Sequence, residues 1–200
     1  DWFAPAYKAG GPVRSVVNMV NLLKKQNEVY VFTKDRDLKD KIPFRDIDED
    51  EWIQAEGFQI YYYSPGKMTI NKVRTVIHEI NPDRIYLNSM FSNMILPMWV
   101  AGKTGKVILC TRGMLKKSAL SVKWFKKFVY LTVLKIWGMD KCLTFHATSK
   151  QEAKDIRRVF PKANKILIAP NLPEPVLREL PEMQKKSGAL NMIFVGRMHP

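Results

Sequence analysis

The chain has 200 residues, of which 46% are apolar, and this is enough to bury the core of one globular domain or slightly more. It contains no stretch of about 18 uncharged apolar residues, so the sequence predicts no transmembrane helix. The formal net charge of +14 favours an anionic partner, and charge alone leaves nucleic acid, an anionic membrane face and a phosphorylated substrate open.

The first residues of the chain and its two cysteines indicate what kind of protein the chain comes from. The opening residues, Asp-Trp-Phe-Ala-Pro, include neither an initiator methionine nor a signal-peptide pattern, so we expect a fragment of a longer protein. Cys110 and Cys142 lie in or beside apolar, strand-like runs. We expect them to be buried free thiols of a cytoplasmic protein, because nothing supports a disulfide framework.

The first motif is Gly10-Gly11-Pro12, directly before an apolar pattern of helical spacing at Val13, Val16, Val17, Val20 and Leu23. Proline suits the first helical turn, and glycine lets the backbone turn sharply and approach a ligand. A helix N-terminus with free N–H groups suits a phosphate. An ordinary loop-to-helix turn is the competing interpretation.

Beyond this helix, short apolar runs alternate with helical patterns. We expect strands at 28–33, 57–63, 84–87, 106–110, 142–146 and 165–168. We expect helices at 70–80, at 91–100 with an interruption at Pro97, at 118–137, and from Ser149 to about Phe160. Ser149 and Glu152 have the spacing of a capping box, in which the serine caps the helix and the glutamate reaches back.

The segment 34–51 is a charged loop with eight acidic and five basic residues. Closely spaced aspartates such as Asp35 and Asp37 are able to hold a divalent metal. Because such pairs recur throughout an acidic segment, we favour a solvated surface and expect no metal site.

This alternation predicts an α/β fold: a doubly wound, mostly parallel sheet with helices on both faces, Rossmann-like. Ligands of such sheets bind at the carboxyl ends of the strands. Gly10-Gly11, Asn88-Ser89 and Thr111-Arg112-Gly113 all follow strands or precede helices, so we expect them at one edge. We expect residues 1–168 to form this domain, 169–189 to be a proline-rich linker, and 190–200 to be the first strand of a second, truncated domain.

At this point the chain resembles a known family, the GT-B-fold, family 4-like retaining glycosyltransferases of bacterial surface polysaccharide synthesis. The likeness rests on four blocks and a closing one, in the family's order. They are Trp2-Phe3-x-Pro5-Ala6-Tyr7 with Gly10–Ser15, then Thr111–Leu115 with Ser118–Leu120, Phe145–Ser149 with Glu152, Ala169–Asn171, and finally Phe194–Pro200.

The resemblance implies the N-terminal, acceptor-side half of an enzyme that transfers a sugar from a nucleotide-diphosphate donor to a glycan or lipid-linked acceptor. It implies no cofactor and no metal, and the fragment alone is expected to be inactive. By position, Arg197 matches the family's donor diphosphate-binding arginine, while Gly10 and Gly11 match the glycine loop. We expect substrate contacts from Arg14, Arg112 and Gly113 as well.

Asn88 stands where many members of the family carry a histidine. An asparagine side chain donates a hydrogen bond but cannot act as a general base near neutral pH. We therefore expect Asn88 to contact substrate, and we assign no catalytic residue. Arg14 and Arg112 also have a structural alternative, which is an ion pair with an acidic side chain.

Five lysines surround Trp124, Phe125 and Phe128 in the predicted helix 118–137: Lys116, Lys117, Lys123, Lys126 and Lys127. One interpretation is a basic, aromatic surface that rests on the anionic inner membrane face, where a lipid-linked acceptor would lie. The other is a core-packed helix with a solvated face.

Two other functions remain open. A polyanion- or nucleic-acid-binding module would explain the charge, but the sequence has no RNP-type aromatic pair, GXXG clamp or zinc spacing, so we expect no nucleic-acid partner. A metal-dependent transferase using the acidic loop ranks last, because cations and N–H groups suffice to stabilise a leaving diphosphate.

Overall fold

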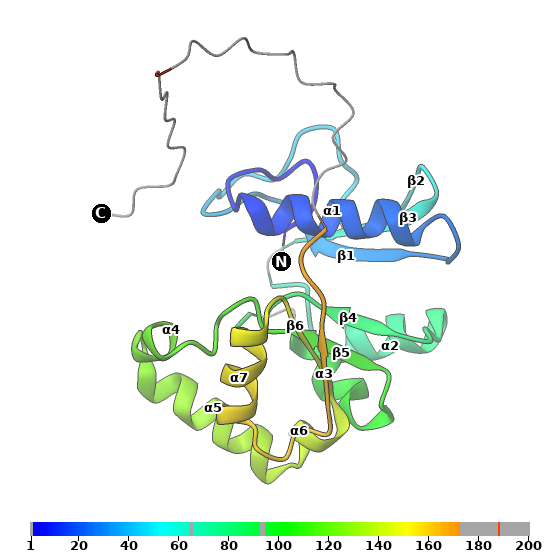
Figure 1. The fold of residues 1–200 in the computed structure, drawn as a ribbon. Coiled ribbons are helices and arrows are strands. Elements are labelled where there is room, and N and C mark those ends of the chain that lie inside the picture. Colours follow the sequence, from blue (N-terminus) through cyan, green and yellow to red (C-terminus); the bar gives the residue numbers. More distant parts are fainter. Residues whose placement is uncertain (1, 65, 93–94, 173–187, 189–200) are drawn as a thin grey trace.

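The computed structural model describes residues 2–64, 66–92, 95–172 and 188. Its strands form two sheets (Figure 1). In the first, β3 (Phe58–Tyr63) lies between β1 (Tyr30–Lys34), which is parallel to it, and β2 (Trp52–Ala55), which is antiparallel. The second is wholly parallel and has the order β4 (Ile85–Leu87), β5 (Val107–Cys110), β6 (Thr144–Ala147), β7 (Lys165–Ile168).

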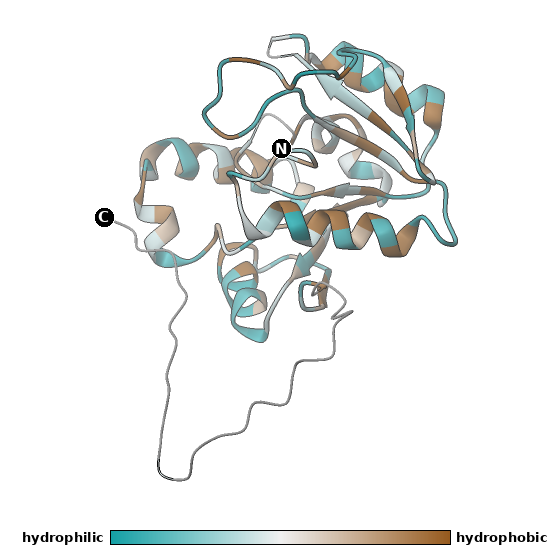
Figure 2. Cartoon of the chain, turned by 90° about the horizontal axis from the view of Figure 1, so that it is seen from above, coloured by the Kyte–Doolittle hydropathy of each residue, from teal (hydrophilic) through white to brown (hydrophobic). Residues whose placement is uncertain are grey.

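Helices separate the strands along the chain. Their bounds are α1 (Gly11–Leu23), α2 (Ile70–Ile80), α3 (Leu96–Ala101), α4 (Lys117–Ser121), α5 (Trp124–Ile136), α6 (Met139–Cys142) and α7 (Lys150–Val159), and a 3₁₀ turn, η2 (Gly102–Thr104), follows α3. Apolar and polar segments alternate along these helices (Figure 2), as expected of helices with one face against a core. Helices flank the second sheet, with α7 against β6 and β7 and α3 against β4.

The first core lies between α1 and the β1–β3 pair. Val20 on α1 is buried together with Phe3, Ile60 and Tyr62, and Val16 and Val17 pack against them. The predicted apolar stripe of α1 therefore faces this core. Its last member, Leu23, is largely exposed.

The second core surrounds β5 and β6. Leu109 and Phe145 are opposite each other in register and are fully buried. Phe160, at the end of α7, stacks on Phe145 with 5.1 Å between ring centroids. Ile156 and Leu134 complete this core from α7 and α5.

The structure confirms an α/β fold with a mostly parallel sheet flanked by helices, compatible with a Rossmann-like fold. It does not show the single continuous sheet that the sequence predicted. The first sheet ends at β1 and the second ends at β4, and these two edge strands are not paired with each other. No short-range pattern indicates which strands are hydrogen-bonded, so this division was not predictable.

Strand β2 was missed. It pairs with β3 across the two-residue turn Glu56-Gly57, with Ala55 opposite Phe58. Gly57 has a φ of +78°, the left-handed conformation that glycine adopts without strain. A two-residue loop ending in glycine is a hairpin pattern that the sequence does contain.

Three predicted boundaries were wrong. Pro97 lies in the first turn of α3 and does not interrupt a longer helix. The predicted helix 118–137 breaks between α4 and α5, where Lys123 has a φ of +52°. Cys142 ends the short helix α6, so β6 begins two residues later than expected.

The charged loop is also less solvated than expected. Asp35 and Asp37 are almost completely buried. Asp35 pairs with Arg36 at 2.7 Å, and Asp37 accepts hydrogen bonds from backbone N–H groups. These two carboxylates are structural, and the solvated-surface interpretation is wrong for them.

Both cysteines are free, as predicted, and Cys110 is buried, but Cys142 is only partly buried. No helix within the described ranges has the length and apolar character needed to cross a bilayer. Most of the predicted linker and the whole predicted strand 190–200 lie outside the described residues.

Candidate functional site

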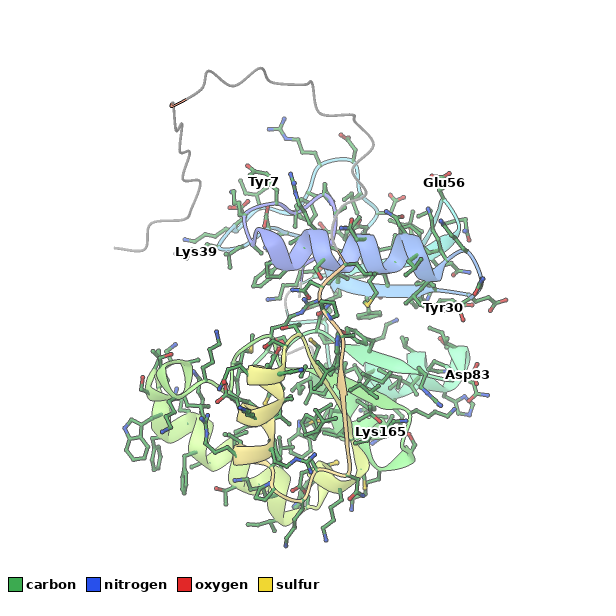
Figure 3. The ribbon with its side chains drawn as sticks, in the orientation of Figure 1. Tyr7, Tyr30, Lys39, Glu56, Asp83 and Lys165 are labelled. Carbon is green, nitrogen blue, oxygen red and sulfur yellow. The ribbon has the colours of Figure 1, made fainter. Side chains whose placement is uncertain are left out.

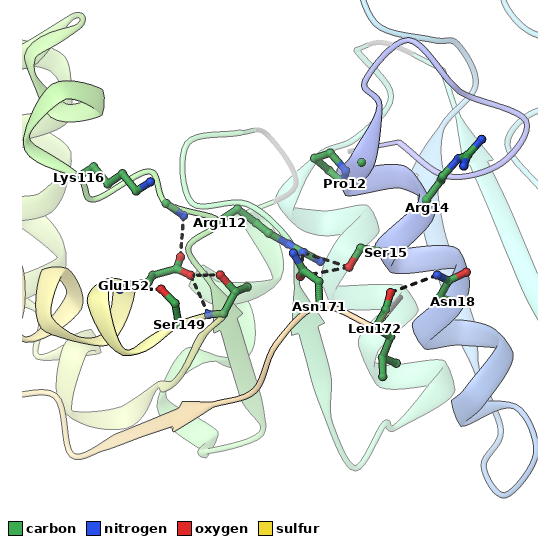
Figure 4. Close-up of a pocket in the computed structure, with 13 residues that line it drawn as sticks. Pro12, Arg14, Ser15, Asn18, Arg112, Lys116, Ser149, Glu152, Asn171 and Leu172 are labelled. Carbon is green, nitrogen blue, oxygen red and sulfur yellow. Dashed lines mark hydrogen bonds between the residues drawn. The ribbon is translucent and has the colours of Figure 1, made fainter. Parts of the chain in front are cut away.

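The side chain of Arg112 joins three parts of the chain, and Figure 4 shows its contacts with two of them, at Ser15 and Asn171. Its Nε donates to Asn88 Oδ1 after β4 at 2.8 Å, and its Nη1 donates to Ser15 Oγ on α1 at 3.2 Å. Nη1 also donates to Oδ1 of Asn171, which follows β7, and the Ser15 hydroxyl donates to the same oxygen. The guanidinium is therefore held in one orientation by groups from both halves of the fold.

Arg112 lies on one wall of a cleft of about 590 Å³. The cleft lies between the N-terminal half of α1, the loop after β5, the start of α7 and the segment after β7 (Figure 4). Its lining residues are Gly11, Pro12, Arg14, Ser15, Asn18, Arg112, Gly113, Lys116, Thr148, Ser149, Glu152, Asn171 and Leu172. The carboxyl ends of β5, β6 and β7 thus open on this cleft, as expected for a parallel sheet.

The N-terminus of α1 forms the wall opposite Lys116. No side chain of the described residues caps it, its first turn carries no acidic residue, and Pro12 has no N–H to satisfy. Gly10 has a φ of +71°, and a Cβ at Gly10 or Gly11 would meet no atom within 4 Å. This end of the helix is therefore open and carries the positive end of the helix dipole.

A buried aspartate positions the loop that leads into α1. Asp37 Oδ2 accepts from the backbone N–H groups of Tyr7 at 2.7 Å and Lys8 at 3.0 Å, and Oδ1 accepts from Leu38 at 2.6 Å. Burial by itself would raise the pKa of Asp37, but these three bonds outweigh it and hold the pKa below its usual value. Tyr7 and Lys39 accordingly lie at the same end of the first sheet, opposite Tyr30 (Figure 3).

Glu152 positions the loop that carries Arg112. Its Oε1 accepts from Thr111 Oγ1 and from the Gly113 N–H, both at 2.6 Å. Its Oε2 accepts from the N–H and the hydroxyl of Thr148, at 2.7 and 2.6 Å. Burial opposes ionisation, yet the four donors keep the pKa of Glu152 below its ordinary value.

This geometry corrects the predicted capping box. Ser149 caps α7 by accepting from the Glu152 N–H at 3.1 Å, as expected. The Glu152 carboxylate does not bond the backbone of Ser149. It bonds Thr148 and the loop after β5 instead, because that loop ends against α7 in the fold.

A second chain of hydrogen bonds lies near Arg112. Tyr86 on β4 bonds His146 Nδ1 at 2.5 Å, and His146 Nε2 lies 2.9 Å from the carbonyl oxygen of Ala169. The thiol of Cys110 raises the pKa of His146, while burial acts in the opposite direction. His146 is therefore bonded within the fold, and it fixes the chain two residues before Asn171.

The cleft is positive. Arg14, Arg112 and Lys116 line it, and the only acidic residue of its described lining is Glu152, whose oxygens are already occupied. Within the described residues, Arg112 forms no ion pair with an acid, and its Nη2 has no hydrogen-bond partner. The predicted structural alternative of an Arg112 salt bridge is therefore not observed.

The structure brings most of the predicted site residues together. Gly11, Arg14, Arg112 and Gly113 line the cleft, and Gly10 directly precedes it. Asn88 does not line the cleft; its oxygen holds Arg112 in place. Arg197 lies outside the described residues.

Sequence reasoning missed the roles of Ser15, Glu152 and Asn171 at the site. All three residues belong to blocks of the family resemblance, and Glu152 was also predicted to be part of a capping box, but neither signal indicated a contact with Arg112 or its loop. Their contacts with the loop after β5 join residues 39 to 97 positions apart, which no local pattern indicates.

Within the described residues, no group of three or more His, Cys, Asp or Glu side chains is arranged to hold a metal ion. Fold and site together define an α/β protein with an open cationic cleft where its strand-to-helix loops meet. Comparison with protein-family models, with curated proteins and with solved structures finds no match for this chain.

Proposed function

We propose that this chain is the acceptor-side, N-terminal domain of a metal-independent, retaining GT-B glycosyltransferase. Such an enzyme transfers a sugar from a nucleotide-diphosphate donor to a glycan or lipid-linked acceptor at the cytoplasmic face of the membrane. The proposal combines the sequence resemblance with one structural observation, the fixed guanidinium of Arg112 facing an open cleft beside the uncapped N-terminus of α1. It includes a doubly wound arrangement of the intact domain and a second, donor-binding domain after residue 189.

The chemistry suits this site. When the bond between the sugar C1 and the diphosphate oxygen breaks, the electron pair stays on the diphosphate, whose negative charge grows. Preorganised cations and N–H groups stabilise that charge without reorganising. Asn88, Ser15 and Asn171 hold Arg112 through Nε and Nη1, and Nη2 is left to donate to a phosphate oxygen.

Lys116 adds a second cation across from α1. Its stem lies beside Gly113, where an added Cβ would be 3.6 Å from its Cε. The ammonium group is on the cleft side of this contact (Figure 4). Arg112 and Lys116 together therefore offer a diphosphate one planar donor and one point charge.

Titration with inorganic diphosphate tests the anion site in this 200-residue chain. Loss of a charge-assisted hydrogen bond costs about 1.5–3 kcal/mol, so Arg112→Met should weaken binding by about 10- to 150-fold. Arg84→Met is the matched control, because Arg84 is exposed and precedes the amino end of β4. Equal affinities of the wild type and Arg112→Met would contradict the proposed site.

Sugar transfer tests the activity itself. A panel of nucleotide-diphosphate sugars is incubated with membrane extract and either this chain or a form extended beyond residue 200. We expect transfer only from the extended form. Full turnover by the 200-residue chain would contradict the proposed division of labour, and no transfer by either form with any donor would contradict the enzyme class.

A further inference from the structure

The helix α5 is apolar on two opposite faces, and in the part of the chain that the structure describes only one of them is covered. Leu131 and Leu134 are buried in the second core. Phe125, Val129 and Ile136 lie within about 40° of one another around the helix and about half a turn away from Leu134. All three are exposed, Phe125 by 63% and Ile136 by 75%. A helix with apolar side chains on two opposite faces is expected to pack on both, and among the described residues nothing covers this second face.

More exposed apolar side chains flank this stripe. We call the aromatic face the set of exposed apolar residues between 122 and 137, namely Val122, Trp124, Phe125, Phe128, Val129, Ile136 and Trp137. It belongs to α5 and the turns at its two ends, at the margin of the second half of the molecule (Figure 1). Several exposed apolar side chains along one helix indicate a site of protein or membrane contact.

The sequence on both sides of the aromatic face carries one sign of charge. From residue 84 to residue 139 the sequence has ten lysines and arginines and no aspartate or glutamate. Lys117, Lys123 and Lys126 are exposed on α4, in the turn and on α5. None of these three forms an ion pair within the described part of the chain.

Lys127 has a different role, and it shows that α4 and α5 form one unit. Its ammonium donates to the carbonyl oxygen of Ala119 at 2.5 Å and lies 5.1 Å from the centre of the Phe91 ring. Lys127 is therefore turned inward and fastens α4 to α5. The exposed lysines of α4 and α5 therefore belong to the same structural unit as the aromatic face.

We propose that the aromatic face docks on an anionic lipid bilayer, with its apolar side chains in the headgroup boundary and the lysines on lipid phosphates. Tryptophan and lysine are the side chains that suit this boundary. A second copy of the chain fits poorly, because a two-fold contact would place the lysines of both copies together. A nucleic acid would neutralise the lysines but leave Val122, Val129 and Ile136 exposed, since aliphatic side chains offer no surface for base stacking.

Docking would also place the cleft beside the lipid. Lys116 lines the cleft and directly precedes α4 as its N-cap residue. A lipid-linked acceptor would therefore reach the cleft from the bilayer without crossing the rest of the domain. This consequence rests on the proposed function, whereas the docking itself does not.

Cosedimentation with vesicles tests the docking in this chain. We expect the protein to pellet with vesicles of phosphatidylcholine and phosphatidylglycerol and to stay in solution with phosphatidylcholine alone. An attraction of about 1 kcal/mol per lysine near an anionic surface predicts that the variant Lys117→Gln/Lys123→Gln/Lys126→Gln binds about a hundredfold more weakly. Lys25→Gln/Lys154→Gln/Lys162→Gln, which removes the same charge elsewhere on the surface, should bind like the wild type.

A second variant tests the apolar part. Trp124→Ser/Phe125→Ser/Phe128→Ser should bind the anionic vesicles at least tenfold more weakly. Its Tm should equal that of the wild type, because these side chains are exposed. Leu22→Ser/Ile42→Ser removes exposed apolar side chains elsewhere and is the control.

Three results would overturn the proposal. The first is equal binding to both kinds of vesicle, or binding that neither triple variant reduces. The second is a protein that does not bind vesicles but forms a dimer in sedimentation velocity, where only the serine variant abolishes the dimer. The third is polyuridine retained on filters through the same lysines without vesicle binding. A failure of diphosphate binding would contradict the proposed function but would not change the vesicle-binding result, so each proposal can be refuted separately.

Discussion

Replacing Glu152 by glutamine tests whether this carboxylate fixes the Arg112 loop. The amide oxygen of glutamine can still accept from Thr111 and Gly113, but its NH₂ group would face the Thr148 N–H. The backbone N–H then faces a donor, whereas the Thr148 hydroxyl can rotate and accept. The main loss is one charge-assisted hydrogen bond in a buried setting.

Such a bond contributes about 1.5–3 kcal/mol. We therefore expect Glu152→Gln to lower the free energy of unfolding by about 2–3 kcal/mol, which in a domain of this size lowers Tm by about 4–12 °C. Glu152→Ala should cost more, because it leaves the buried donors of Thr111, Gly113 and Thr148 without an acceptor. Urea titrations at neutral pH, followed by circular dichroism, measure both variants.

The pH dependence supplies an independent check. Because the folded state holds the pKa of Glu152 below its ordinary value, the ionised carboxylate stabilises the fold above the unfolded pKa of about 4.3. That contribution is lost as the pH falls through the folded pKa. The difference between wild type and Glu152→Gln should accordingly shrink in acid. Equal stabilities at neutral pH, or a difference that grows as the pH falls, would refute the assigned network.

Three further changes test the loop before α1. Gly10→Ala should destabilise the fold by about 1–3 kcal/mol in urea titrations, because φ at Gly10 is +71° even though there is space for a methyl group. Gly11→Ala should be neutral or slightly stabilising. Equal effects of the two substitutions on stability would contradict the assigned turn. Gly11→Ala should nevertheless weaken diphosphate binding in titration calorimetry, because its methyl group would enter the cleft. Asp37→Asn should cost about 1.5–3 kcal/mol at neutral pH, and since the folded pKa is lowered, the cost should vanish as the pH falls through it. An Asp37 effect that persists in strong acid would show that its charge is not involved.

Local patterns predicted the elements whose cause is local. The helix α1 begins with Gly11-Pro12 and buries Val13 and Val20, as its spacing indicated. The serine cap of α7 and the whole extent of β7 were also correct. These features depend on neighbours within about four residues, which the sequence displays directly.

The errors share one origin. The burial of Asp35 and Asp37 depends on a neighbouring guanidinium and on backbone amides about 30 residues away, so composition alone suggested a solvated loop. The break between α4 and α5 depends on the left-handed backbone at Lys123, where the sequence has no glycine or proline that would indicate a turn. In both cases a tertiary contact or a strained backbone outweighed the local preference.

The sequence by itself determined the α/β alternation, the open turn at Gly10-Gly11, the positive charge of the chain and the acid-free stretch from 84 to 139. Only the tertiary structure decided that the strands form two sheets and that Asn88, Ser15 and Asn171 all hold Arg112. It also decided that no described residue covers one apolar face of α5. The physical reason is that periodicity and capping act over one helical turn or one strand. Sheet order, a shared hydrogen-bond network and the covering of a helix face depend on which distant segments pack together.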